Sequence, residues 1–240
     1  MDPRAAAAPE PDGGLPPSLP PRQRWRLTLA RSADAPRLAG RELADAWEGT
    51  LEASGLPVHR PAGRTRARVA FGAPLSMGIA AERELADIVL TEVCPAWRVR
   101  EAIAGRCPEG WWLVDLYDVW LGGPPLAGQV VAADYRIEVG GSDPTAVAEA
   151  AAALLRAPAI RRERTKGNAV VAYDLRPLLL RVGVAQAGPP LVVRARTRFH
   201  PLLGTGRPEE VVAALGDLLG TPLTTSAIIR ERLVLSDEEA

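Results

Sequence analysis

The chain has 240 residues, 47% of them hydrophobic and 24% charged, which is ordinary for a soluble globular protein and long enough for two small domains. Its 29 basic and 29 acidic residues balance to zero net charge, so the chain as a whole does not attract polyanions. No apolar run approaches about 18 residues, the length of a membrane span, and the N-terminus lacks the apolar core of a signal peptide. We therefore expect a cytoplasmic protein that engages no membrane.

The first half predicts a leader followed by one folded unit. Residues 1–22 are rich in alanine and proline and have no periodicity, which predicts a disordered leader. The unit covers residues 23–121, and its expected elements are strand 24–30, helix 40–54, strands 64–71 and 86–91, a helix from Pro95, and strand 110–120. Gly72, Pro74 and Gly78 separate the two central strands.

The second half repeats this order after a linker at residues 122–128. The unit covers residues 129–236, and its expected elements are strand 131–139, helix 144–155 capped by Asp143, hairpin 160–165 and 169–174, strands 180–185 and 191–199, helix 208–219, and strand 227–235. The sequence therefore predicts an α+β protein of two tandem ferredoxin-like (β-α-β-β-α-β) units, the second with an extra strand. Residues 237–240 are expected to be a frayed tail.

The sequence offers no recognisable catalytic or metal chemistry. Cys94 and Cys107 are too few for an iron–sulfur cluster and lack the spacing of a zinc site. Asp115 and Asp118 fall on opposite faces of their expected strand, so they are not a carboxylate pair. We expect no cofactor, no metal and no catalytic residue, and we favour a protein that is not an enzyme.

Arginine stripes are the most informative feature, because outward strand residues of a ferredoxin-like unit share the sheet face that its helices leave open. The expected binding residues on these faces are Arg24, Arg26, Arg64, Arg66, Arg68, Arg194, Arg196, Arg198, Arg230 and Arg232. Asp87, Asp115, Asp134 and Glu138 lie among them, so cross-strand ion pairing on a solvated sheet is one interpretation. The other is contact with an RNA backbone, because the arginines outnumber the acids.

The aromatic residues divide into two groups. Trp47, Trp97 and Trp112 lie on apolar faces and are expected in the core. Trp111 and Tyr117 are expected to point outward, where they would either pack between the units or form a stacking surface.

Five segments together resemble the radical SAM-linked (radical SAM-associated) protein family, a bacterial domain of unknown function. They are residues 55–58, 69–90, 132–139, 164–179 and 206–215. The chain departs from the family pattern at residues 31–43 and 59–67. The resemblance implies that a radical SAM enzyme is the partner of this protein, although the chain itself lacks the CxxxCxxC-type motif of such an enzyme.

Three functions remain open at this point. The first is a non-catalytic accessory protein of a radical SAM enzyme that presents an RNA or polypeptide substrate through its basic sheet faces. The second is a pure protein–protein adaptor without nucleic-acid contact, which an apolar outer patch would favour. The third is an enzyme with a site in the cleft between the units, formed by His59, Lys166, Asp174 and Arg176.

Overall fold

The computed structural model describes residues 19–38, 40–166 and 169–238. Residues 1–18 of the expected leader and the tip of the expected hairpin, 167–168, lie outside the described residues. The strands are β1 (Gln23–Arg31), β2 (Ala70–Phe71), β3 (Ala80–Leu90), β4 (Trp111–Val119), β5 (Val130–Gly140), β6 (Arg161–Lys166), β7 (Ala169–Asp174), β8 (Leu179–Ala187), β9 (Leu191–His200), β10 (Gly204–Thr205) and β11 (Thr224–Leu235). The helices are α1 (Gly40–Ala53), α2 (Ala96–Ala104), α3 (Leu126–Gln129), α4 (Pro144–Arg156) and α5 (Pro208–Leu219), with 3-10 turns at Arg176–Leu178 and Ser236–Glu238.

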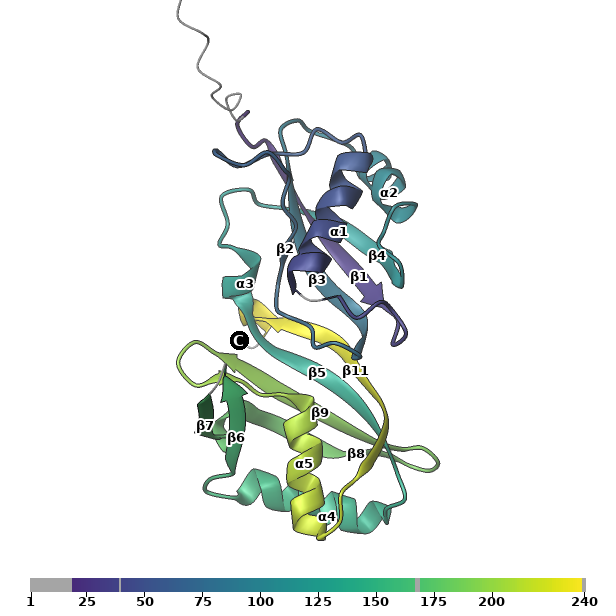
Figure 1. Ribbon diagram of the computed structural model, residues 1–240, viewed down its shortest axis with the longest axis vertical. Helices are drawn as coiled ribbons and strands as arrows, with labels where there is room; N and C mark the ends of the chain where they lie inside the picture. The colour runs from purple at the N-terminus through teal and green to yellow at the C-terminus, as the bar shows by residue number, and fades with distance from the viewer. Residues whose placement is uncertain (1–18, 39, 167–168, 239–240) are drawn as a thin grey trace, which may run out of the picture.

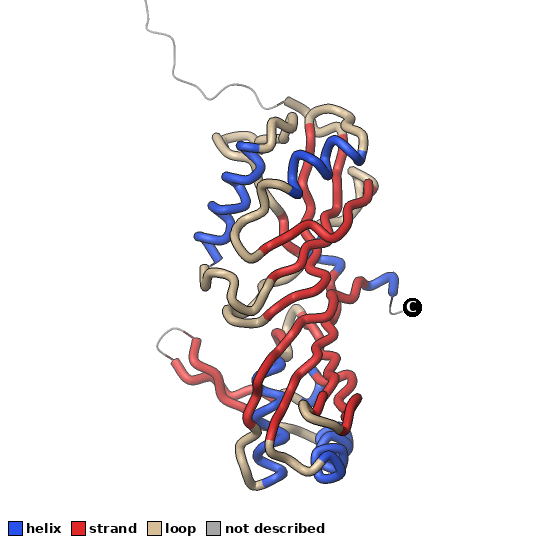
Figure 2. The backbone as a smooth tube through the Cα atoms, turned by 90° about the vertical axis from the view of Figure 1, so that its right-hand side faces the viewer, coloured by secondary structure: helices blue, strands red, loops and turns tan. Residues whose placement is uncertain are grey.

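The fold is mixed α+β, as the sequence predicted, and nine of the described strands form one mixed sheet. The strand order is β10-β9-β5-β11-β3-β1-β4, with β2 also beside β3 and β8 also beside β9. Figure 1 shows two lobes: β1, β3, β4, α1 and α2 form the first, and β5, β8, β9, α4 and α5 form the second. The lobes join where β11 runs parallel to β3, pairing Ile229 with Ala80 and Arg230 with Ala81. The β6–β7 hairpin stands out from the body (Figure 2).

Each lobe has its own apolar core. In the first, Leu27 and Leu29 of β1 and Ile88 and Leu90 of β3 are buried together with Trp47 of α1, which confirms the expected alternation on these strands. In the second, α4 and α5 contribute most of the apolar residues that face β5, β8 and β9. None of the described helices has the length and apolar character needed to cross a membrane.

The expected strand at residues 64–71 is wrong over most of its length. Strand pairing is confined to Ala70–Phe71, which pairs with β3, while β11 occupies the edge of β3 near Ala80. Conversely, β3 begins at Ala80 rather than at residue 86. Its first half was missed because Glu84 interrupts the apolar alternation, and this carboxylate is buried beside Arg230.

The expected positions of three tryptophans are also wrong. Trp111 is buried, with its ring centroid 5.8 Å from that of Trp47, whereas Trp97 and Trp112 are exposed. For Trp111 and Trp112 the cause is a β-bulge, because Thr28 pairs with Asp115 while its neighbour Leu29 pairs with Leu113; Trp97 lies on α2, where Val99, Ala102 and Ile103 form the buried face instead. The extra residue in β4 reverses which alternate side chains face the core.

Candidate functional site

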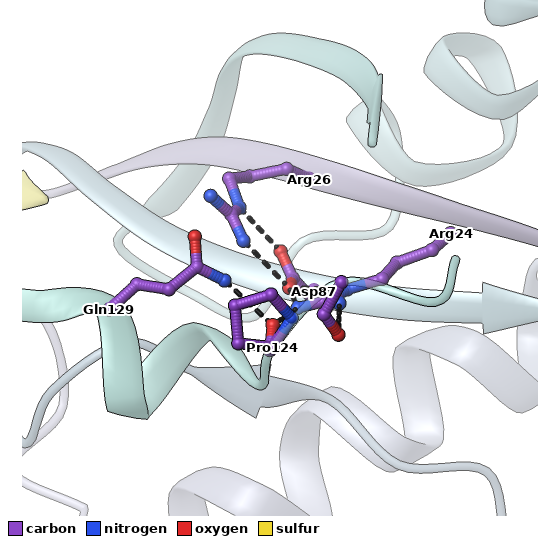
Figure 3. Close-up of polar contacts among 6 residues, drawn as sticks. Arg24, Arg26, Asp87, Pro124 and Gln129 are labelled. Carbon is purple, nitrogen blue, oxygen red and sulfur yellow. Dashed lines mark hydrogen bonds and ion pairs between the residues drawn. The ribbon is translucent and has the colours of Figure 1, made fainter. Parts of the chain in front are cut away.

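Arg24 and Arg26 do not lie on an open face. Both are buried around the carboxylate of Asp87, as Figure 3 shows, with Arg26 4% and Asp87 3% exposed. Arg24 Nε donates to Asp87 Oδ2 at 2.8 Å, and Arg26 Nε donates to Asp87 Oδ1 at 2.8 Å. Burial by itself lowers the pKa of Arg26, but the hydrogen bond and charge of Asp87 outweigh it, so the pKa of Arg26 is raised.

The chain between the lobes covers this arginine cluster. Arg24 Nη1 donates to the carbonyl of Gly123 at 3.1 Å, and Arg24 Nη2 donates to that of Pro124 at 3.0 Å. The Gln129 amide nitrogen also donates to Pro124, at 2.7 Å (Figure 3). The expected plain linker 122–128 is therefore a structured connector that ends in α3. Because the connector covers them, Arg24 and Arg26 are not accessible to a ligand. The expectation that they lie on a solvated sheet face is therefore wrong.

Arg64, Arg66 and Arg68 are exposed, but they lie in the loop before β2 rather than on a strand. Arg66 Nη1 lies 3.8 Å from Asp45 Oδ1 on α1. These three arginines therefore do not extend the stripe formed by β1.

The arginines of β9 do alternate on the outer face of the second lobe, as predicted. Arg196 Nε lies 2.6 Å from Asp134 Oδ1, and Arg232 Nε lies 3.0 Å from Asp134 Oδ2. Arg194 Nη2 lies 3.3 Å from Glu231 Oε1. Burial alone raises the pKa of Asp134, but hydrogen bonds and charge from the two arginines lower it below its usual value. The cross-strand ion pairing that the sequence suggested accounts for most of this face.

Within the described residues, Arg198 has no ion pair, and the same holds for the exposed Arg181 on β8, which is opposite Arg196. Arg230, by contrast, does not belong to the outer face. Its guanidinium and the carboxylate of Glu84 form an ion pair in which each side chain is 1% exposed.

The four residues expected in a cleft do not meet. Asp174 Oδ1 accepts hydrogen bonds from the backbone of Ile160 at 2.7 Å and of Arg176 at 2.9 Å, which fixes a turn. The Arg176 guanidinium donates to two backbone carbonyls of its own lobe. His59 lies in the first lobe, with Nδ1 2.9 Å from the carbonyl of Leu19. Lys166 ends β6 and pairs with Ala169.

The structure has an exposed apolar surface on and directly after the outermost strand of the first lobe, of which the sequence reasoning predicted only Tyr117. We call it the β4 edge surface, and it consists of Trp112, Val114, Tyr117 and Trp120. Trp112 is 48% exposed and Trp120 79%. Beside Trp120, a hollow of about 320 Å³ is lined in part by the exposed Val93. The signal was present in the segment GWWLVDLYDVW, because apolar residues occupy both alternating sets and one face cannot bury them all.

The rest of the described chain holds no group of three or more His, Cys, Asp and Glu side chains able to bind a metal. Cys94 is buried, and burial raises the pKa of the Cys107 thiol. Neither thiol is therefore poised as a nucleophile.

Comparisons with known proteins identify a family for this chain but no activity. The model of a family described as "Uncharacterized protein conserved in bacteria (DUF2344)" matches residues 24–208. None of the curated proteins matches. A similar solved structure, the "Crystal Structure of a Cbf5-Nop10-Gar1 Complex", contains a chain with 10% sequence identity and a TM-score of 0.49. The match covers 87% of this chain and 48% of that one, so this chain spans about half its length.

Proposed function

The chain belongs to the DUF2344 family of uncharacterized proteins conserved in bacteria, and we propose that it is a non-catalytic protein–protein adaptor whose partner docks on the β4 edge surface. Following the sequence resemblance, the partner that we propose is a radical SAM enzyme, and the complex would act in the cytoplasm. The observation that carries the adaptor function is the exposure of Trp112 and Tyr117 on β4 and of Trp120 directly after it.

Exposed tryptophans in such a row are costly to leave in water and effective in binding. Tryptophan and tyrosine are enriched among the residues that dominate binding energy at protein interfaces. A buried aromatic side chain removes about 150–250 Å² from water. At about 25 cal/mol per Å², this corresponds to about 4–6 kcal/mol for a fully exposed side chain before the costs of association, and to about half of that for Trp112, which is 48% exposed. Trp112 and Trp120 together could therefore anchor a partner.

The position of β4 in the sheet adds a second reason. In the part of the chain that the structure describes, β4 pairs with β1 on one side and with no strand on the other. An open edge offers backbone groups to an extended segment of another protein. Apolar side chains and free backbone groups therefore occur on the same strand.

RNA contact is a second candidate function, favoured by Arg181 and Arg198, which form no ion pair with the residues that the structure describes, and by Arg194 on the same strand as Arg198. If these arginines bind an RNA backbone, replacing all three with serine should flatten the salt dependence of binding. The expected change is about 0.7 in log–log slope per lost single-strand phosphate contact. An unchanged slope would remove this candidate.

We also infer that the two lobes are tandem ferredoxin-like units, over the predicted ranges 23–121 and 129–236. The order β8-β9-β5-β11, with α4 and α5 as connections, supports this for the second lobe, where β6–β7 is an insertion. The order β4-β1-β3-β2 supports it for the first.

The adaptor function can be tested by cross-linking in the native cell, followed by identification of the captured proteins and RNA. The complex is then rebuilt from the purified partner. We expect Trp112→Ser combined with Trp120→Ser to weaken binding at least tenfold, because both anchors are lost. Leu202→Ser is the control, since Leu202 is an apolar residue of the second lobe that is more exposed than either tryptophan. Equal binding by the two variants would contradict the proposal, as would capture of RNA alone.

A further inference from the structure

A small cavity lies where the two lobes meet, and it has no part in the adaptor function. Its volume is about 150 Å³. From the first lobe it is lined by the loop before β3, and from the second by the turn that leads into α5. The lining residues are Pro74, Leu75, Ser76, Ile79, Tyr135, Phe199, Thr205, Gly206, Arg207, Pro208 and Arg230. Three of the segments singled out in the sequence, 69–90, 132–139 and 206–215, therefore converge on it.

Two buried arginines hold the first-lobe side of the cavity. Arg230 Nη1 donates to the carbonyl of Pro74 at 2.8 Å. Arg31 Nη2 donates to the carbonyl of Ser76 at 2.7 Å, and Arg31 Nε to that of Ile79 at 3.1 Å. The loop before β3 is thus fixed by hydrogen bonds from the cationic side chains of Arg31 and Arg230.

Positive charge exceeds negative charge beneath this loop. Arg230 is neutralised by Glu84, with Nε 2.5 Å from Oε1. Arg31 is buried and has no ion pair within the described chain, and its guanidinium carbon lies 5.6 Å from the ring centroid of Trp111. Burial lowers the pKa of Arg31, with Glu84 opposing that change and Arg230 adding to it. An uncompensated buried cation is costly, and an anion nearby would offset that cost.

Hydrogen-bond donors line the cavity as well. Ser76 and Thr205 carry hydroxyl groups, and the Tyr135 hydroxyl accepts a hydrogen bond from Arg230. Arg207 precedes the first turn of α5 and is exposed, and its side chain does not cap the helix. The positive end of the α5 dipole therefore adds to the arginine charge on this side. The carboxylates of the first turn, Glu209 and Glu210, oppose that contribution, so the donors of the site are the side chains of Arg207, Ser76 and Thr205 rather than the helix dipole.

We propose that this cavity binds the phosphate group of a small ligand. Guanidinium groups, hydroxyl groups and the start of a helix are the donors that proteins use for phosphate. A volume of about 150 Å³ equals about five water molecules at about 30 Å³ each, which leaves room for a phosphate and a short attached skeleton. A ligand held here contacts both lobes at once.

The test titrates the full chain with inorganic phosphate, with chloride at the same ionic strength as the reference. Backbone amide chemical shifts report on residues that line the cavity. We expect saturable shifts at Ser76, Thr205 and Gly206 with phosphate and none with chloride. Thr205→Val combined with Arg207→Gln should weaken phosphate binding at least tenfold. Arg100→Gln changes an exposed arginine of α2 that does not line the cavity, so it is the matched control and should leave binding unchanged.

A second variant distinguishes a specific phosphate site from general screening of protein charges by salt. Glu84→Gln removes the carboxylate that neutralises Arg230, so phosphate should raise the melting temperature of this variant more than that of the wild type. The proposal is overturned if phosphate and chloride act alike, if shifts do not saturate, or if Arg100→Gln weakens binding as much as the cavity variant. Failure here leaves the adaptor function untouched, because the β4 edge surface is measured with a protein partner.

Discussion

Replacing Asp87 with asparagine should destabilise the first lobe strongly. Asp87 is the shared counter-charge of Arg24 and Arg26, and all three side chains are buried. Asparagine keeps one acceptor oxygen but carries no charge, so two guanidinium groups would remain buried without compensation. Breaking a buried ion pair in this way costs about 3–5 kcal/mol. That is a large fraction of the about 5–15 kcal/mol by which a domain is usually stable.

Equilibrium denaturation in urea measures this cost, with Asp115→Asn as the control. Asp115 also pairs with an arginine, Arg100, at 2.8 Å, but both side chains are about half exposed. An exposed pair contributes about 0–1 kcal/mol, so the control should lie close to the wild type. Proteolysis adds a local measurement, because loss of the Arg24 anchor should make residues 120–125 more easily cut.

A free energy of unfolding for Asp87→Asn within about 1 kcal/mol of the wild type would refute the reasoning. It would mean that Arg24 and Arg26 remain hydrated when their partner is lost, as on the solvated face that the sequence suggested. A further variant adds Arg24→Met and Arg26→Met to Asp87→Asn. It should recover much of the lost stability, because apolar replacements remove the stranded charges.

Three other measurements test separate parts of the structure. Leu90→Ala should lower the free energy of unfolding by about 2–5 kcal/mol, because Leu90 is fully buried in the first core. Asp134→Asn should make the free energy of unfolding less dependent on pH. The pKa of Asp134 is lowered in the folded protein, so its carboxylate contributes stability above the unfolded pKa of about 3.9, and this stability is lost as the pH falls through the folded pKa. The wild type should therefore lose more stability between pH 5 and 2 than the variant. The purified protein should contain no stoichiometric iron, and iron–sulfur absorbance that disappears in a Cys94→Ala, Cys107→Ala variant would contradict this.

Local periodicity was sufficient to predict most elements. The apolar spacing and the Pro208 start placed α5 at residues 208–219, where the structure has it. Strands β1 and β5 were located within about one residue at each end because their alternation is clear. These features depend on residues close in sequence, so no knowledge of the tertiary fold was needed.

Burial of the arginines could not be predicted in the same way. The alternation of apolar and polar residues indicates that Arg24 and Arg26 share a face of the strand, but it does not indicate whether another segment covers that face. The cover comes from Gly123 and Pro124, about 100 residues later, and it uses backbone carbonyls that carry no residue-specific signal. The bulge in β4 is likewise set by pairing with β1, so the exchanged positions of Trp111 and Trp112 follow from contacts between distant segments.

Two buried acidic residues of β3, Glu84 and Asp87, link the first lobe to the connector and to the second lobe. In the β1–β3 pairing, Glu84 is opposite Leu29 and Asp87 is opposite Arg26. Because the two carboxylates are three residues apart on one strand, they point to opposite faces of β3. On one face Asp87 holds Arg24, which binds the connector before α3. On the other, Glu84 holds Arg230 of β11, the strand that carries the sheet into the second lobe. Because the backbone pairing between β3 and β11 covers few residues, we expect these buried pairs to help fix the orientation of the lobes, and their carboxylates account for Arg24, Arg26 and Arg230 without a ligand.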